Sequence, residues 1–119
     1  MIFFAYTEIV ITFVQKLLQM VKPNEEELKV IDNVEECVCS YFGVNADKLP
    51  SRTKTLNIAM ARAFVFYILH TDYNISINKI ANTYFRTPRL VNWQCEKIRY
   101  LIKLKNYAKM YNDILGAIK

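Results

Sequence analysis

The sequence predicts an all-α protein, a compact multi-helix domain that contains a helix-turn-helix. Only two of the 119 residues are glycine and 53% are hydrophobic, which excludes a disordered or collagen-like chain. Hydrophobic residues also recur at helical spacing over long segments. The stretch from Ser76 to Lys97 predicts a short helix, a tight turn and a longer helix. A chain of 119 residues is long enough to form one domain with a single hydrophobic core.

Capping residues predict the boundaries of the helix-turn-helix. Ser76 is a typical N-cap, and hydrophobic residues follow it at helical spacing. The run 84–86 breaks that spacing. Thr87 and Pro88 then restart a helix, with an N-cap residue followed by proline at the first helical position.

Charge is unevenly distributed along the chain. Residues 1–47 carry three Lys or Arg against eight Asp or Glu, whereas residues 48–105 carry eleven against two. A basic block joined to a helix-turn-helix is the electrostatic footprint of a protein that binds the phosphate backbone. The sequence therefore predicts double-stranded DNA as the partner. This prediction requires Arg62, Arg86 and Arg89 to face solvent.

The other helices are predicted from caps and hydrophobic spacing. Asn24 and Asp32 both begin capping patterns, so the first domain helix is expected to start at one of the two, and Gly43 is expected to end it. Residues 45–49 are expected to form at most one helical turn, and residues 51–55 a basic loop. A central hydrophobic helix is predicted at 56–70 and a final amphipathic helix at 105–118.

We predict that residues 1–29 form an apolar N-terminal helical extension of a domain at 30–119. Residues 2–21 are hydrophobic on nearly every side, so the domain or a second copy is expected to cover them. The run 9–14 is rich in β-branched residues and leaves a strand open as the alternative. Charged residues leave too short an uncharged run to span a bilayer, so no membrane partner is predicted.

Three segments of the chain carry a family resemblance. They are VIDNVEECVCSYFGVNADKLPSR, ARAFVFYILHTDYNISINKIA and VNWQCEKIRYL. They are similar, without gaps and in the same order, to segments of the C-terminal DNA-binding domain of the bacterial chromosomal replication initiator DnaA. The resemblance covers residues 30–104 and implies a Trp-repressor-like helical fold.

The resemblance also implies DNA contacts. Lys54 stands where the basic loop of the family inserts an arginine into the minor groove, and Arg52 is its basic neighbour. Arg62 matches an arginine that holds a phosphate in the family. Ile77 and Asn78 lie where the family's Leu-Pro pair approaches the DNA backbone.

The predicted base-reading residues depart from the family pattern, in a run one residue shorter. In the family run GGRDHTTV, the aspartate, histidine and threonine read base edges. Here Thr87, Pro88, Arg89 and Leu90 replace the aspartate, the histidine and the two threonines in that order. Arginine prefers guanine, whereas aspartate accepts from cytosine, so the preferred DNA sequence should differ from the initiator box. The residues expected to grip the backbone are Arg52, Lys54, Arg62, Arg86 and Lys97.

The long helix that starts at Pro88 is also expected to carry an exposed hydrophobic stripe. Trp93, Tyr100 and Leu104 should lie on the side opposite its core residues. A stripe of this kind usually marks a contact surface. Residues 2–21, a second copy or a partner protein are the candidates to cover it.

No catalytic, metal or cofactor site is predicted. Gly43 and Gly116 are the only glycines, so no phosphate-cradling loop exists and the ATPase module of the initiator is expected to be absent. His70 is the sole histidine, and Cys37 and Cys39 are spaced poorly for a metal. An odd number of cysteines without a framework spacing indicates reduced thiols and a cytoplasmic, nucleoid-associated setting.

Two functions remain open from the sequence. The first is a stand-alone DNA-binding protein with a DnaA-type domain, related to replication or regulation. The alternative is a protein-interaction module on the same scaffold, which acts by oligomerisation or partner binding through the N-terminal helix and the aromatic stripe.

Overall fold

The computed structural model describes residues 10, 13–14, 22–52 and 55–118. Over these ranges the chain is helical, with no strand, and the all-α prediction is confirmed. The elements are α2 (Glu25–Phe42), the 3-10 turn η1 (Ala46–Lys48), α3 (Leu56–Thr71), α4 (Ile77–Thr83), α5 (Pro88–Leu101) and α6 (Lys105–Ala117).

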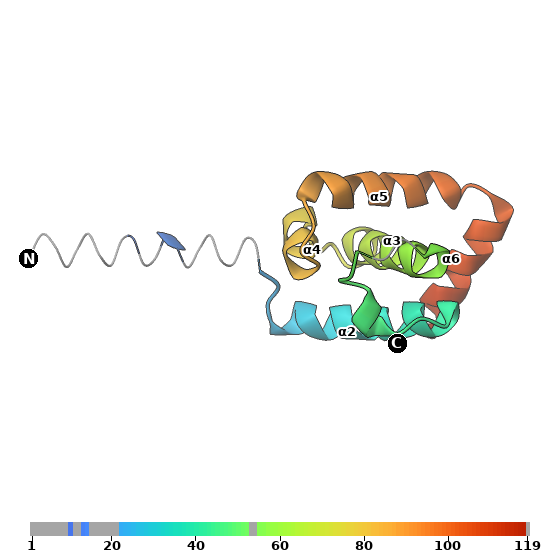
Figure 1. Ribbon diagram of the computed structural model, residues 1–119, viewed down its shortest axis with the longest axis horizontal. Helices are drawn as coiled ribbons and strands as arrows, with labels where there is room; N and C mark the ends of the chain where they lie inside the picture. Colours follow the sequence, from blue (N-terminus) through green and yellow to red (C-terminus); the bar gives the residue numbers. More distant parts are fainter. Residues whose placement is uncertain (1–9, 11–12, 15–21, 53–54, 119) are drawn as a thin grey trace, which may run out of the picture.

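Helix α3 forms the centre of the domain. It packs against α2 and α5, which lie on opposite sides of it, while α4 and α6 lie toward opposite ends (Figure 1). All residues from Ala61 to Leu69 are buried. A helix that is hydrophobic on every side needs neighbours all round, and this explains its central place.

The ends of α2 follow local signals. Asn24, rather than Asp32, is the N-cap, and its side chain accepts a hydrogen bond from the Glu27 amide. Gly43 ends the helix in the left-handed region at φ 66°, as predicted. Asp32 lies inside the helix because the capping box at Asn24 and Glu27 forms about two turns earlier.

The long helix of the helix-turn-helix ends sooner than predicted. Helix α5 stops at Leu101, and Leu104 is the N-cap of α6. The amides of Lys103 and Leu104 bond to carbonyls three residues earlier, which tightens the last turn. This turn directs α6 back toward α2, so that Ile114 enters the core.

Most of the predicted N-terminal extension lies outside the described residues. Val10, Phe13 and Val14 are helical and exposed. The rest of 2–21 stays a prediction. Among the described residues, no helix combines the length and hydrophobicity needed to cross a membrane.

Candidate nucleic-acid interface

Both helices of the helix-turn-helix begin at the predicted caps. The Ser76 hydroxyl accepts from the Lys79 amide at 3.2 Å, and the Thr87 hydroxyl accepts from the Leu90 amide at 3.2 Å. Pro88 occupies the first position of α5. Each hydroxyl satisfies one of the amides that a helix start leaves without a partner.

The turn between α4 and α5 contains a residue with unusual backbone geometry. Phe85 has φ 56° and is 79% exposed. The Tyr84 amide bonds to the Ile80 carbonyl, and the Arg86 amide bonds to the Ala81 carbonyl at 2.9 Å. These two bonds close α4, and the left-handed residue redirects the chain into α5.

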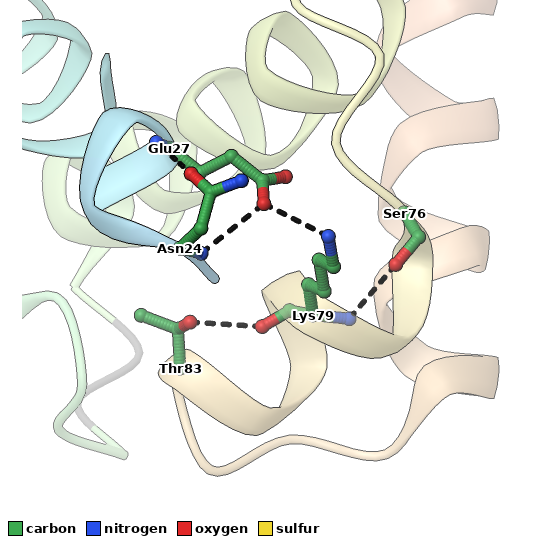
Figure 2. Close-up of polar contacts among 5 residues, drawn as sticks. All are labelled: Asn24, Glu27, Ser76, Lys79 and Thr83. Carbon is green, nitrogen blue, oxygen red and sulfur yellow. Dashed lines mark hydrogen bonds and ion pairs between the residues drawn. The ribbon is translucent and has the colours of Figure 1, made fainter. Parts of the chain in front are cut away.

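Helix α4 is fixed to the start of α2 by a polar cluster (Figure 2). The Lys79 ammonium donates to the Glu27 carboxylate at 2.8 Å, and the Asn24 amide donates to the same oxygen at 3.2 Å. The hydrogen bond from Lys79 is the main cause that lowers the pKa of Glu27. The carboxylate therefore both caps α2 and holds α4 in place.

A second link joins the turn to α2. Tyr84 is almost fully buried, stacks near Phe66 with ring centroids 5.1 Å apart, and donates its hydroxyl hydrogen bond to Glu35. Burial, the largest cause, raises the pKa of Glu35. Helix α2 thus holds both ends of α4.

Two arginines converge on the loop that precedes α3. Arg62 of α3 donates from Nε to the Leu49 carbonyl and from Nη2 to the Ser51 carbonyl, both at 2.7 Å. Arg86 of the turn donates from Nη2 to the same Ser51 carbonyl at 2.5 Å. Burial first, and the charge of Arg86 second, lower the pKa of Arg62.

A pocket of about 430 Å³ opens between α3, the loop and the start of α5. We call it the arginine pocket, and its lining residues are Arg52, Ala59, Arg62, Phe85, Arg86, Thr87, Leu90 and Gln94. These described lining residues include three arginines and no acid. The N-terminus of α5 adds the positive end of a helix dipole. The pocket has the chemistry that suits an anion.

The structure separates the predicted contact residues by exposure. Those with exposed side chains are Arg52, Asn78, Thr87, Pro88, Arg89, Leu90 and Lys97. Ile77 and Arg86 are half-buried. Lys54 lies outside the described residues.

The expectation that all three arginines face solvent is wrong for Arg62. Its side chain is only 6% exposed, because its guanidinium turns inward to the carbonyls of the loop. Arg89 is exposed as expected.

The predicted stripe is exposed. Trp93 is 58%, Tyr100 67% and Leu104 52% exposed. The Lys97 ammonium lies 5.6 Å from the centre of the Trp93 ring, and that of Lys103 lies 5.8 Å from Tyr100. The surface therefore combines aromatic rings with positive charge.

Gln94 was missed in the sequence. It lines the arginine pocket, and its buried Oε1 has no hydrogen-bond partner among the described residues. Thr87, Leu90 and Gln94 are spaced three and four residues apart, so helical spacing from the predicted cap was the signal that could have found it.

The family model for the bacterial DnaA protein helix-turn-helix matches residues 31–98, which is more than half of the chain. The chain belongs to this family. The predicted DnaA C-terminal-type helix-turn-helix is confirmed, and this type of domain binds DNA rather than catalysing a reaction.

A curated relative agrees with the DnaA assignment. The "Chromosomal replication initiator protein DnaA" of Synechococcus sp. (strain JA-2-3B'a(2-13)) is 28% identical over 81 residues. The aligned part covers 66% of this chain but only 17% of that relative. No solved structure matches the chain significantly.

Proposed function

We propose that this chain binds double-stranded DNA through the start of α5, the turn before it and the loop that carries Arg52. The observation that carries the proposal is the arginine pocket, which lies at the helix start that enters the major groove in this motif. Family membership supports the same face. Such a partner implies a cytoplasmic, nucleoid-associated location.

The distribution of charge favours one orientation on DNA. Helix α2 carries exposed acids at Glu25, Glu26, Asp32 and Glu36. It lies on the side of α3 opposite α5 (Figure 1). Like-charge repulsion therefore keeps α2 away from the phosphates, while α5 approaches them.

We assign the backbone contacts to the exposed cations Arg52 and Lys97. Ile77 and Asn78, at the start of α4, are proposed to approach the backbone as the family resemblance implies. Arg62 takes a different role in this proposal, because its buried guanidinium supports the loop from inside.

Base reading is proposed to fall mainly on Arg89. The Thr87 hydroxyl caps α5, and Pro88 offers no polar side-chain group. An exposed arginine at the second position of the helix can pair with guanine O6 and N7. A sequence preference that differs from the initiator box follows from this set. Selection from random oligonucleotides tests it, because Arg89→Ala should flatten the preference for guanine.

Salt dependence provides the direct test of DNA binding. We expect the affinity for duplex DNA to fall steeply with salt, and Lys97→Ala to reduce the log-log slope by about 0.9. Fluorescence anisotropy at several salt concentrations measures both. Lys109→Ala removes one exposed charge from α6 and is the matched control. Equal effects of the two variants, or a salt-independent affinity, would contradict the proposal.

The exposed stripe favours a second function, a protein-interaction module. Trp93, Tyr100 and Leu104, with the exposed side chains of Phe13 and Val14, are proposed to bind a second copy or a partner protein.

Analytical ultracentrifugation of the whole chain tests this second function. Trp93→Ala should shift an oligomer toward monomer, since loss of a central aromatic contact typically costs more than 1 kcal/mol. Tyr73→Ala, an exposed aromatic in another part of the fold, is the control. A wild-type chain that remains monomeric at high concentration excludes self-association as the function of the stripe.

A further inference from the structure

We infer that Arg86 is a positioning residue, which ties the loop that carries Arg52 to the helix-turn-helix turn so that both bind DNA as one unit. This inference rests on the proposed DNA binding. The sequence predicts that Arg86 grips the DNA backbone, whereas the geometry points to a role inside the protein.

The guanidinium of Arg86 bridges two segments far apart in the sequence. Its Nη2 lies 2.5 Å from the Ser51 carbonyl, and its Nη1 lies 3.3 Å from the Pro50 carbonyl. The same Nη1 lies 3.1 Å from the Tyr84 carbonyl of its own turn. A planar fork holds its donors on separate nitrogens in a fixed geometry that reaches both segments, whereas an ammonium offers its three donors from one nitrogen.

The loop is anchored from the other side as well. Leu49 is fully buried, and Arg62 bonds to its carbonyl and to that of Ser51. Residues 49–51 are therefore held between α3 and the turn. Arg52 follows directly after this clamped segment and is exposed.

This arrangement sets the distance between two DNA contacts. Arg52 lies on the loop and lines the arginine pocket. Arg89 lies at the start of α5, in the sequence between Thr87 and Leu90, which line the same pocket. Without Arg86, the loop loses its bonds to the turn. The bonds from Arg62 still hold residues 49–51 to α3, but nothing then ties them directly to the turn before α5, so most of the contribution of Arg52 to DNA affinity should be lost.

A double-mutant cycle tests the inference on the whole chain with duplex DNA. In the wild type, Arg52→Ala should weaken binding about fivefold to tenfold at 0.1 M salt. In an Arg86→Ala background, the same change should weaken it less than twofold. In an Arg89→Ala background, which leaves the clamp intact, the effect of Arg52→Ala should remain at full size.

Hydroxyl-radical footprinting separates loss of positioning from simple loss of stability. A less stable protein should lose protection over the whole DNA site and not only where the loop binds. Arg86→Ala should remove the protection contributed by the loop and keep the protection contributed by α5. Arg86→Lys keeps the charge without the fork, so it should show the same coupling loss. If Arg86→Ala does not fold, Arg86→Lys provides the test of the inference in its place.

Additive effects of Arg52→Ala and Arg86→Ala would overturn the inference, because they would mark Arg86 as an independent phosphate contact. Loss of both footprints together would also overturn it. Absence of duplex binding by the wild type is a separate result, which refutes the proposed function itself.

Discussion

Arg62→Ala is expected to lower the free energy of unfolding by roughly 2–4 kcal/mol. Arg62 is nearly buried and donates charge-assisted hydrogen bonds to the Leu49 and Ser51 carbonyls. Truncation removes these donors and leaves the carbonyl of fully buried Leu49 without the bond from Arg62. Urea denaturation followed by circular dichroism measures the loss as a lower midpoint at an unchanged slope.

Arg99→Ala is the matched control for Arg62. Arg99 lies on the surface of α5 and pairs with Glu96 at 2.6 Å while both side chains remain about half exposed. Exposed pairs of this kind contribute little, so we expect a change below about 0.5 kcal/mol. A cost at Arg62 as small as that at Arg99 would show that the loop is held by other contacts.

Tyr84→Phe should destabilise the fold by about 1.5–3 kcal/mol at pH 7, through loss of a hydrogen bond to a charged group. The partner is the half-buried carboxylate of Glu35. Burial raises the pKa of Glu35, the hydroxyl of Tyr84 opposes that rise, and the nearby charge of Asp32 adds to it.

The cost of Tyr84→Phe should depend on pH in a defined direction. A carboxyl whose pKa is raised by folding contributes most to stability below its unfolded pKa, and this contribution is lost as the pH rises through the folded value. Removal of the hydroxyl raises the folded pKa of Glu35 further. The variant should therefore lie close to the wild type in acid, and the difference should reach its full size near neutrality.

Chemical denaturation between pH 4 and pH 7.5 measures this trend. Glu35→Gln supplies the control, because an uncharged amide still accepts the hydroxyl but does not titrate. In that background the effect of Tyr84→Phe should not vary with pH. A cost that is constant with pH in the native background would contradict this prediction, because it would show that the hydrogen bond contributes equally to the charged and the neutral Glu35 carboxyl.

Local signals explain why much of the fold could be predicted from the sequence. Ser76, Thr87 and Gly43 act on backbone groups within a few residues, so the sequence alone places the helix ends that they form. The exposed side of α5 follows from helical periodicity, which placed Trp93 and Tyr100 correctly.

The inward direction of Arg62 could not be predicted in the same way. Its partners are main-chain carbonyls of a separate segment, and any residue type at positions 49 and 51 would offer them. The choice between Asn24 and Asp32 as a cap was open for a related reason. Both begin a valid pattern, and the contact between Glu27 and Lys79 supports the first only once α4 lies beside α2.

The acidic outer side of α2 has a consequence for how many duplexes one molecule engages. A copy seated on DNA through α5 turns these carboxylates toward the surrounding solution. A second double helix that approaches from that direction meets repulsion rather than attraction. One molecule on its own should thus bind a single duplex. Bridging or compaction of DNA would need two copies joined to each other.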